Sequence, residues 1–193
     1  MKTVLFVDAC LRGPEQSRTY ALCRHFLEEY CAAHPGTEVI HRDLGKEPFP
    51  LMTGELAEQR ESWPEDHPLL VPAREVAQAD LILVGAPYWD LAFPAALKAY
   101  LEWASCLGIT FRYTEDGRQV GMSRAEALVY CTTAGGPVQG QNFGYDYIRA
   151  LAAMFGIETA HCAAAEGLDI FGNDVEAILS KTRAELSELA QKL

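Results

Sequence analysis

The stretch TVLFVDACLRGPEQSRTYAL, residues 3–22, decides the fold class. It opens with an uninterrupted apolar run at residues 3–7, which predicts a strand buried on both faces. A turn with Arg, Gly and Pro at positions 12 to 14 follows, and from Ser17 the apolar residues recur at helical spacing to about residue 31. A buried strand that leads into a helix is typical of α/β proteins with a parallel sheet.

The remainder of the chain repeats this alternation. Further strands are predicted at residues 38–44, 80–86, 128–133 and 157–163, and helices at residues 69–79, 94–107, 145–155 and 175–193. Residues 45–68 are polar and rich in proline, so we predict a long excursion there. Asp116-Gly117 predicts a turn between two short extended pieces within residues 109–121. We therefore expect one α/β domain over residues 1–193, with a five-stranded parallel sheet covered by helices on both faces.

Composition excludes several classes of function. The formal net charge of -11 argues against nucleic acid and against an anionic membrane surface, because both are bound by Lys and Arg. The apolar runs are too short to span a bilayer, and the N-terminal residues lack the pattern of a signal peptide, so we expect a cytoplasmic protein. The six cysteines and five histidines form no metal-ligand spacing, and no metal is predicted.

Ligands of such sheets bind outside the carboxyl ends of the strands, which directs attention to three loops. In the first loop, the start of the helix at Ser17 presents hydroxyls and free N–H groups to which a dianion could bind, with Arg12, Arg18 and Thr19 nearby. The alternative is that Ser17 only caps the helix. Cys10 lies in the same loop, either as a thiol of lowered pKa near these cations or as a buried strand end.

The other two loops carry aromatic residues and glycines. Tyr88 and Trp89 follow a stiff Pro87, so one of these rings lies against a flat ligand or a second subunit, unless the two only close over the next helix. In TTAGG, residues 132–136, Gly135 and Gly136 allow backbone N–H groups to approach a ligand closely, unless the loop is merely flexible. All three loops converge on one crevice in this topology, which favours a single shared site.

The motifs in and around these loops resemble those of a known family. APYWDLAFPAALKAYLEWASCLGITFRYTEDG, residues 86–117, is similar to the P-M-Y-N-F-x-x-P-x-x-L-K-x-Y-x-D and G-x-T-F-x-Y-T-x-x-G segments of flavodoxin-like NAD(P)H-dependent oxidoreductases, in particular the FMN-dependent NADH:quinone reductases and azoreductases. SRT at residues 17–19 resembles the family's S-x-S phosphate turn, and TTAGG its S-x-G-G loop. The resemblance covers nearly the whole chain. It implies a flavodoxin-like, doubly wound sheet of order 2-1-3-4-5 and a homodimer with flavin sites at its interface.

The resemblance also implies roles for particular residues. The FMN phosphate is expected to be held by Arg12, Ser17, Arg18 and Thr19. The isoalloxazine ring is expected along Pro87, Tyr88, Trp89, Asp90 and Leu91, with its pyrimidine edge at Thr133, Gly135 and Gly136. The substrate is expected near Phe111, Tyr113, Phe143 and Tyr145. The implied reaction moves hydride from NADH or NADPH through N5 of tightly but non-covalently bound FMN to a quinone, azo compound or similar flat acceptor. Its kinetics are ping-pong, and it needs no catalytic side chain.

Departures from the family pattern keep other interpretations open. Ala9-Cys10 stand where the family has Ser, Asp90 replaces Asn, Leu91 replaces Phe and Tyr88 replaces Met. One alternative is a flavodoxin-like electron carrier that serves a protein partner. Another is a flavin-free phosphatase or regulator. A cysteine-based phosphatase needs C-x-x-x-x-x-R, a spacing that Cys10 does not have, and a receiver-type regulator needs an acidic pair after the first strand, where only Asp8 is present.

Overall fold

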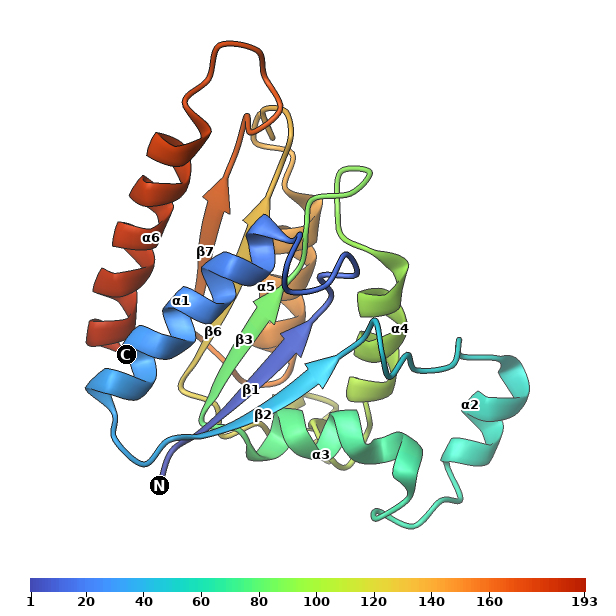
Figure 1. Cartoon of the computed structure of the whole chain (residues 1–193). Coiled ribbons are helices and arrows are strands. Elements are labelled where there is room, and N and C mark those ends of the chain that lie inside the picture. The colour runs from blue at the N-terminus through green and yellow to red at the C-terminus, as the bar shows by residue number, and fades with distance from the viewer.

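A parallel five-stranded sheet forms the centre of the computed structural model, which describes all residues from 1 to 193 (Figure 1). Its order is β2-β1-β3-β6-β7. The strands are β1 (Thr3–Asp8), β2 (Glu38–Asp43), β3 (Leu81–Gly85), β6 (Ala127–Thr133) and β7 (Ala160–Ala165). Counting only these strands along the chain, the order is 2-1-3-4-5, so the predicted topology is confirmed.

Helices cover both faces of the sheet. On one face lie α1 (Arg18–Ala33) and α6 (Val175–Lys192), and on the other α3 (Val71–Gln78), α4 (Ala95–Ala104) and α5 (Phe143–Met154), with a short 3-10 helix η1 (Pro68–Leu70) before α3 (Figure 1). None of the helices is both long enough and apolar enough to cross a membrane. The two covered faces explain why the central strands β1, β3 and β6 are almost continuously apolar in sequence, whereas the edge strand β2 is not.

The strand β1 shows how the two cores arise. Val4 and Phe6 pack against the α1 and α6 side, whereas Leu5 and Val7 pack against the α3, α4 and α5 side. Successive side chains of a strand point to opposite faces, so both sets must be apolar. Each such burial contributes about 1.5–3 kcal/mol to folding.

The polar excursion between β2 and α3 contains a helix that its prolines concealed. This helix, α2 (Gly54–Arg60), starts at Thr53, whose side chain accepts a hydrogen bond from Leu56 N. The excursion lies against α4, where Trp103 Nε1 donates to Pro50 O at 2.7 Å. It is therefore an ordered, anchored segment.

The predicted turn at Asp116-Gly117 joins a two-stranded hairpin, β4 (Phe111–Tyr113) and β5 (Gln119–Gly121). Gly121 lies directly against the backbone of Phe155 and Gly156, just after α5. The hairpin leads into the amino end of β6. It therefore lies at the opposite edge of the sheet from the loops that follow β1, β3 and β6.

The ends of several elements differ from their predicted positions, and α4 ends at Ala104, three residues before its predicted end at residue 107. α5 begins at Phe143, two residues early, because the side chain of Asn142 caps it by accepting from Tyr145 N at 2.9 Å. β7 begins at Ala160 rather than residue 157. The chain first turns at Gly156, whose φ of +90° is in the left-handed region that favours glycine.

Candidate functional site

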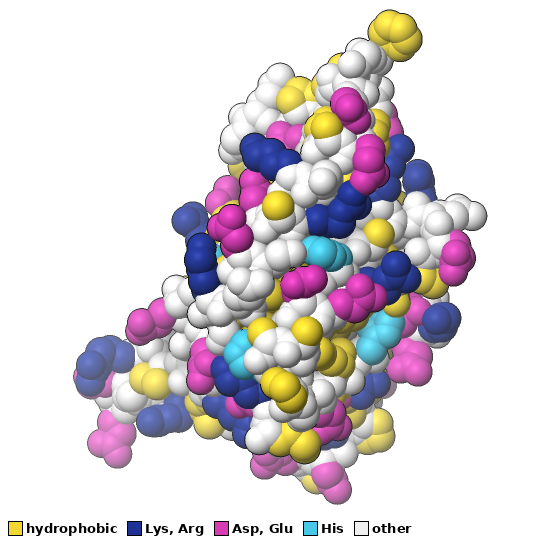
Figure 2. Space-filling view, turned by 60° about the vertical axis from the view of Figure 1, so that its left-hand side comes forward, with side chains coloured by type: hydrophobic (Ala, Val, Ile, Leu, Met, Phe, Trp, Pro, Cys, Tyr) yellow, Lys and Arg dark blue, Asp and Glu magenta, His cyan; other side chains and the backbone are white.

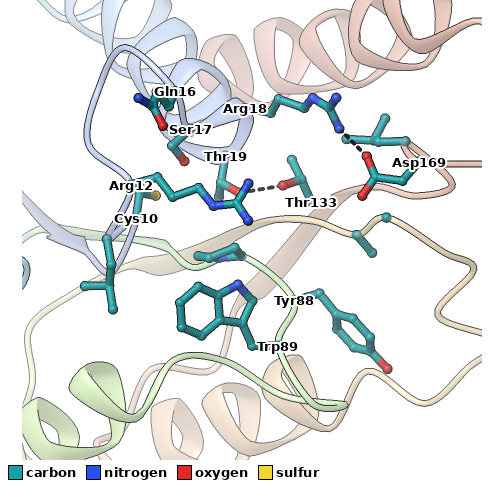
Figure 3. Close-up of a pocket in the computed structure, with 15 residues that line it drawn as sticks. Cys10, Arg12, Gln16, Ser17, Arg18, Thr19, Tyr88, Trp89, Thr133 and Asp169 are labelled. Carbon is teal, nitrogen blue, oxygen red and sulfur yellow. Dashed lines mark hydrogen bonds and ion pairs between the residues drawn. The ribbon is translucent and has the colours of Figure 1, made fainter.

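Four loops at the carboxyl edge of the sheet border one pocket of about 250 Å³ (Figure 3). Its lining residues are Cys10, Leu11, Arg12, Gln16, Ser17, Arg18, Thr19, Pro87, Tyr88, Trp89, Thr133, Ala134, Gly135, Leu168 and Asp169. The structure thus brings together the predicted cofactor residues except Asp90, Leu91 and Gly136. These three lie in the same loops but outside the lining.

The N-terminus of α1 opens into this pocket. Asp8 holds the preceding turn, because its buried carboxylate accepts a hydrogen bond from Cys10 N at 2.8 Å. The N–H groups of Arg18 and Thr19, in the first turn of α1, have no acceptor in the protein. Thr19 Oγ1 and Thr133 Oγ1 are 2.7 Å apart, which joins α1 to the end of β6. This corner therefore offers free donors and a positive helix end to an anion.

The capping role of Ser17 does not exclude the anion-binding role that the sequence left as its alternative. Its Oγ accepts a hydrogen bond from Tyr20 N at 3.1 Å, so it is the N-cap of α1. A hydroxyl also carries one hydrogen to donate, and that hydrogen is not used by the cap. Capping the helix and donating to a bound anion are thus compatible.

Replacing Ser17 by Ala should lower the free energy of unfolding of the cofactor-free protein by about 1 kcal/mol, the usual cost of losing such a cap. Urea denaturation monitored by circular dichroism measures this. An unchanged unfolding midpoint would show that the cap contributes nothing here.

Two arginines at the pocket differ in their partners. Arg18 Nη1 lies 3.0 Å from Asp169 Oδ1 and forms an ion pair. Arg12 forms no hydrogen bond or ion pair with another side chain, and in Figure 3 its guanidinium reaches across the pocket below Ser17 and Thr19. Arg12 is therefore the cation that remains available to a ligand.

Cys10 does not supply the hydroxyl that the family has at this point. Its Sγ is 3.6 Å from Gly85 O, to which it donates. Burial raises the pKa of the Cys10 thiol far above its usual value, and the nearby charge of Asp8 raises it further. The idea of a thiol with lowered pKa is therefore wrong, and Cys10 is a neutral residue in the pocket wall.

The loop after β3 presents two aromatic side chains to the pocket. Tyr88 is half-buried and donates from its hydroxyl to Gln141 O at 3.1 Å, while Trp89 is 41% exposed. Figure 3 shows both rings along the lower side of the pocket. A flat ligand could stack on such a wall.

A tight turn follows these rings. Trp89 and Ala92 exchange backbone hydrogen bonds of 3.3 and 2.8 Å, and between them Asp90 and Leu91 have φ of 49° and 70°. Two successive left-handed residues define a type I′ turn, which prefers Asn and Gly. A leucine held in this region costs about 1–3 kcal/mol, and such strain is concentrated at functional sites.

The residues predicted to line the substrate site are distributed differently. Phe111 and Tyr113 belong to the hairpin at the opposite edge of the sheet. Phe143, the first residue of α5, is 53% exposed. Tyr145 packs on Tyr130 and donates to Ala160 O at 2.8 Å. Within one chain, the structure does not bring these four predicted residues to the pocket.

Sequence reasoning missed the contribution of the loop after β7. Leu168 and Asp169 line the pocket, yet only the loops after the first, third and fourth strands were considered. The signal was present, because all parallel strands end at the same edge and Asp169 follows directly on the fifth. No cluster of three or more His, Cys, Asp or Glu side chains could hold a metal ion.

Comparison with known proteins places this arrangement in a family. Residues 2–190 match the family model described as flavodoxin-like fold. The chain is 36% identical, over the full length of both chains, to an FMN-dependent NADH:quinone oxidoreductase of Coprothermobacter proteolyticus. It shares 36% identity over the same extent with FMN-dependent NADH:quinone oxidoreductase 2 of Clostridium acetobutylicum. The crystal structure of an azoreductase from Bacillus anthracis superposes with a TM-score of 0.87 over both whole chains, at 27% identity. The chain therefore belongs to the flavodoxin-like fold family.

Proposed function

We propose that this chain is an FMN-dependent oxidoreductase that transfers hydride from NADH to quinones and azo compounds. One observation carries the proposal. The unpaired guanidinium of Arg12 and the free N–H groups of Arg18 and Thr19 meet in one pocket whose opposite wall is aromatic. A phosphate fits the first part and a flat ring the second, which is the chemistry of FMN. The full-length likeness to FMN-dependent NADH:quinone oxidoreductases supports the same cofactor.

The protein's own contribution is position and electrostatics. FMN, when bound, would supply hydride transfer between nicotinamide and acceptor. Ser17, Thr19 and Arg12 would hold its phosphate, and Tyr88 and Trp89 would set the plane of its ring. The N–H groups of Gly135 and Gly136 would donate to the pyrimidine edge, where negative charge grows on reduction. Because the nucleotide and the acceptor would use the same face of the flavin ring in turn, ping-pong kinetics are expected. NADPH is the second nucleotide to compare with NADH.

The proposal is tested by reconstitution and turnover. The purified protein is freed of cofactor, titrated with FMN by fluorescence quenching, and then assayed with NADH and a soluble quinone such as a substituted benzoquinone. Steady NADH oxidation with quinone alone supports the enzyme. FMN binding with no oxidation until a reductase is added would instead support a one-electron carrier. Absence of FMN binding would overturn both and favour a flavin-free protein.

A homodimer forms the second part of the proposal. Exposed apolar side chains are found in the turn after β3, on α5 and on or next to the hairpin: Trp89, Leu91, Tyr113, Val120, Met122, Phe143 and Tyr147. Such a surface suits a second copy of the chain, which could bring Phe111 and Tyr113 to the partner's pocket. Light scattering should give twice the mass of 21.3 kDa. A monomer at micromolar concentration contradicts this part.

The surface charge favours a small-molecule partner over a polyanion such as a nucleic acid. On the face drawn in Figure 2, acidic and basic side chains are interspersed, and the net charge is -11. All six cysteines are free, which suits a reducing compartment, and we propose that the enzyme works in the cytoplasm.

Replacing Asp90 by Asn should raise the flavin midpoint potential, because a nearby carboxylate disfavours the negatively charged reduced form. Asn also adopts the left-handed conformation of this position, where φ is 49°, so the turn is kept. Spectroscopic potentiometry measures the shift. Asp66→Asn, at an exposed residue with no hydrogen bond, is the matched control for charge. A potential that stays constant or falls would mean that only the backbone of Asp90 meets the ring.

A further inference from the structure

The segment that follows β7, residues 166–169, runs alongside the loop that follows β6, and we call it the brace. Three of its backbone N–H groups donate to three successive carbonyls: Leu168 to Ala134 (3.1 Å), Asp169 to Gly135 (2.9 Å) and Gly167 to Gly136 (3.1 Å). The side chain of Glu166 adds a fourth contact, because its Oε2 accepts from Val138 N at 2.8 Å. The brace therefore fixes the orientation of this loop peptide by peptide.

The brace also determines where the free donors of the loop point. In a planar trans peptide, the N–H of one residue lies opposite the carbonyl of the residue before it. The carbonyls of Ala134 and Gly135 are turned toward the brace, so the N–H groups of Gly135 and Gly136 point away from it. Neither N–H has an acceptor in the protein, and Gly135 lines the pocket.

Asp169 links the brace to the phosphate corner. Its Oδ1 accepts from Arg18 Nη1 at 3.0 Å, at the start of α1 (Figure 3). Its Oδ2 lies so close to Gly135 that a Cβ built on that glycine would be only 2.4 Å away. One carboxylate thus touches both the first turn of α1 and the donor loop. The carboxylate also explains why residue 135 is a glycine. The φ of Gly135 is outside the left-handed region, so the backbone conformation alone would allow other residues there.

We propose that Asp169 is a positioning residue for the isoalloxazine ring, acting through Gly135. Its side chain sets the place of the Gly135 backbone, and the rest of the brace turns the N–H groups of Gly135 and Gly136 toward the ring. This inference rests on the proposed function, because the ring is that of FMN. It assigns a role to a loop outside the three that the topology singled out.

The test introduces Gly135→Ala into three backgrounds and measures the FMN dissociation constant of each protein by fluorescence quenching. In the wild-type background the methyl group would lie 2.4 Å from Asp169 Oδ2 and 3.3 Å from its Cβ, and Arg18 holds the carboxylate in place. The loop should therefore shift, and FMN should bind about tenfold more weakly or worse, since two hydrogen bonds are lost. Asp169→Asn keeps the shape of the side chain, so the same loss is expected there. Asp169→Ala removes the carboxylate and leaves only the Cβ of residue 169, 3.3 Å from the new methyl group, so Gly135→Ala should then cost about threefold or less.

Each outcome has one meaning. An equal loss in all three backgrounds would show that the new methyl group meets FMN itself, which overturns the role of Asp169. No loss in any background overturns it as well. A wild-type protein that does not bind FMN would instead overturn the proposed function.

Two further readouts separate positioning from general damage. Riboflavin should lose as much affinity as FMN in the Gly135→Ala protein, because the donors serve the ring and not the phosphate. The urea midpoint of the cofactor-free protein should change little, since the Asp169 side chain that the methyl group meets is 71% exposed. A loss confined to FMN, or a large fall in the midpoint, would contradict the proposal.

Discussion

The Arg12→Ala protein should bind FMN about 10- to 100-fold more weakly than the wild type, because a charge-assisted hydrogen bond to phosphate contributes about 1.5–3 kcal/mol. Arg12 has no carboxylate partner in the protein, so its full charge is available to the ligand. Riboflavin lacks the phosphate, and its affinity should change far less. The measurement is a pair of fluorescence titrations, one with each flavin, at the same ionic strength.

Matched variants isolate the contribution of the guanidinium. Arg12→Lys keeps the charge but not the planar fork, so an intermediate loss is expected. Arg24→Ala removes a cation from the exposed side of α1, where it pairs only with Glu28 at 3.5 Å, and should leave both affinities unchanged. An equal loss for FMN and riboflavin in the Arg12→Ala protein would mean that Arg12 meets the ring instead of the phosphate.

Replacing Gly121 by Ala should destabilise the protein by about 3 kcal/mol or more, at the upper end of the range for overpacking. A Cβ at this position would lie 2.0 Å from Gly156 N and 2.1 Å from the Phe155 carbonyl carbon. These are backbone atoms that no side-chain rotation can move aside. The hairpin must therefore separate from the end of α5, or the protein unfolds.

The measurement is the urea midpoint of the cofactor-free protein, and Gly54→Ala is its control. Gly54 begins α2, has open space around its Cα and a φ outside the left-handed region, so Ala should be neutral or slightly stabilising there. A Gly121→Ala protein as stable as this control would show that the hairpin is free to move from α5.

How much of the fold can be predicted from the sequence depends on whether the interactions that stabilise each element are local or long-range. The central strands β1, β3 and β6 were predictable because local runs of apolar residues indicate burial on both faces. Ser17 and Thr19 were predictable because a helix start presents its donors wherever it lies. Helix α2 was not, since its anchors, such as the hydrogen bond from Arg60 Nη1 to Glu102 O at 3.2 Å, connect residues far apart in the chain.

The residues of the site likewise divide into those placed by the sheet topology and those placed by long-range contacts. Arg12, Trp89 and Gly135 reach one pocket because their strands end at one edge, which topology alone dictates. Asp169 escaped prediction because its role depends on two contacts with distant residues, and neither leaves a local pattern. The placing of Tyr113 near a substrate depends on the proposed second copy of the chain, about which the spacing of residues within one chain says nothing.

The left-handed pair Asp90 and Leu91 has a consequence for laboratory evolution of this protein. A selection for heat resistance alone should enrich glycine or asparagine at these two positions, because either residue relieves the conformational cost of the turn. The same replacements alter the residues beside the aromatic wall. At Leu91, variants that survive hotter conditions through this route would be expected to trade away catalytic competence, so a screen that scores both properties at once should leave Leu91 in place.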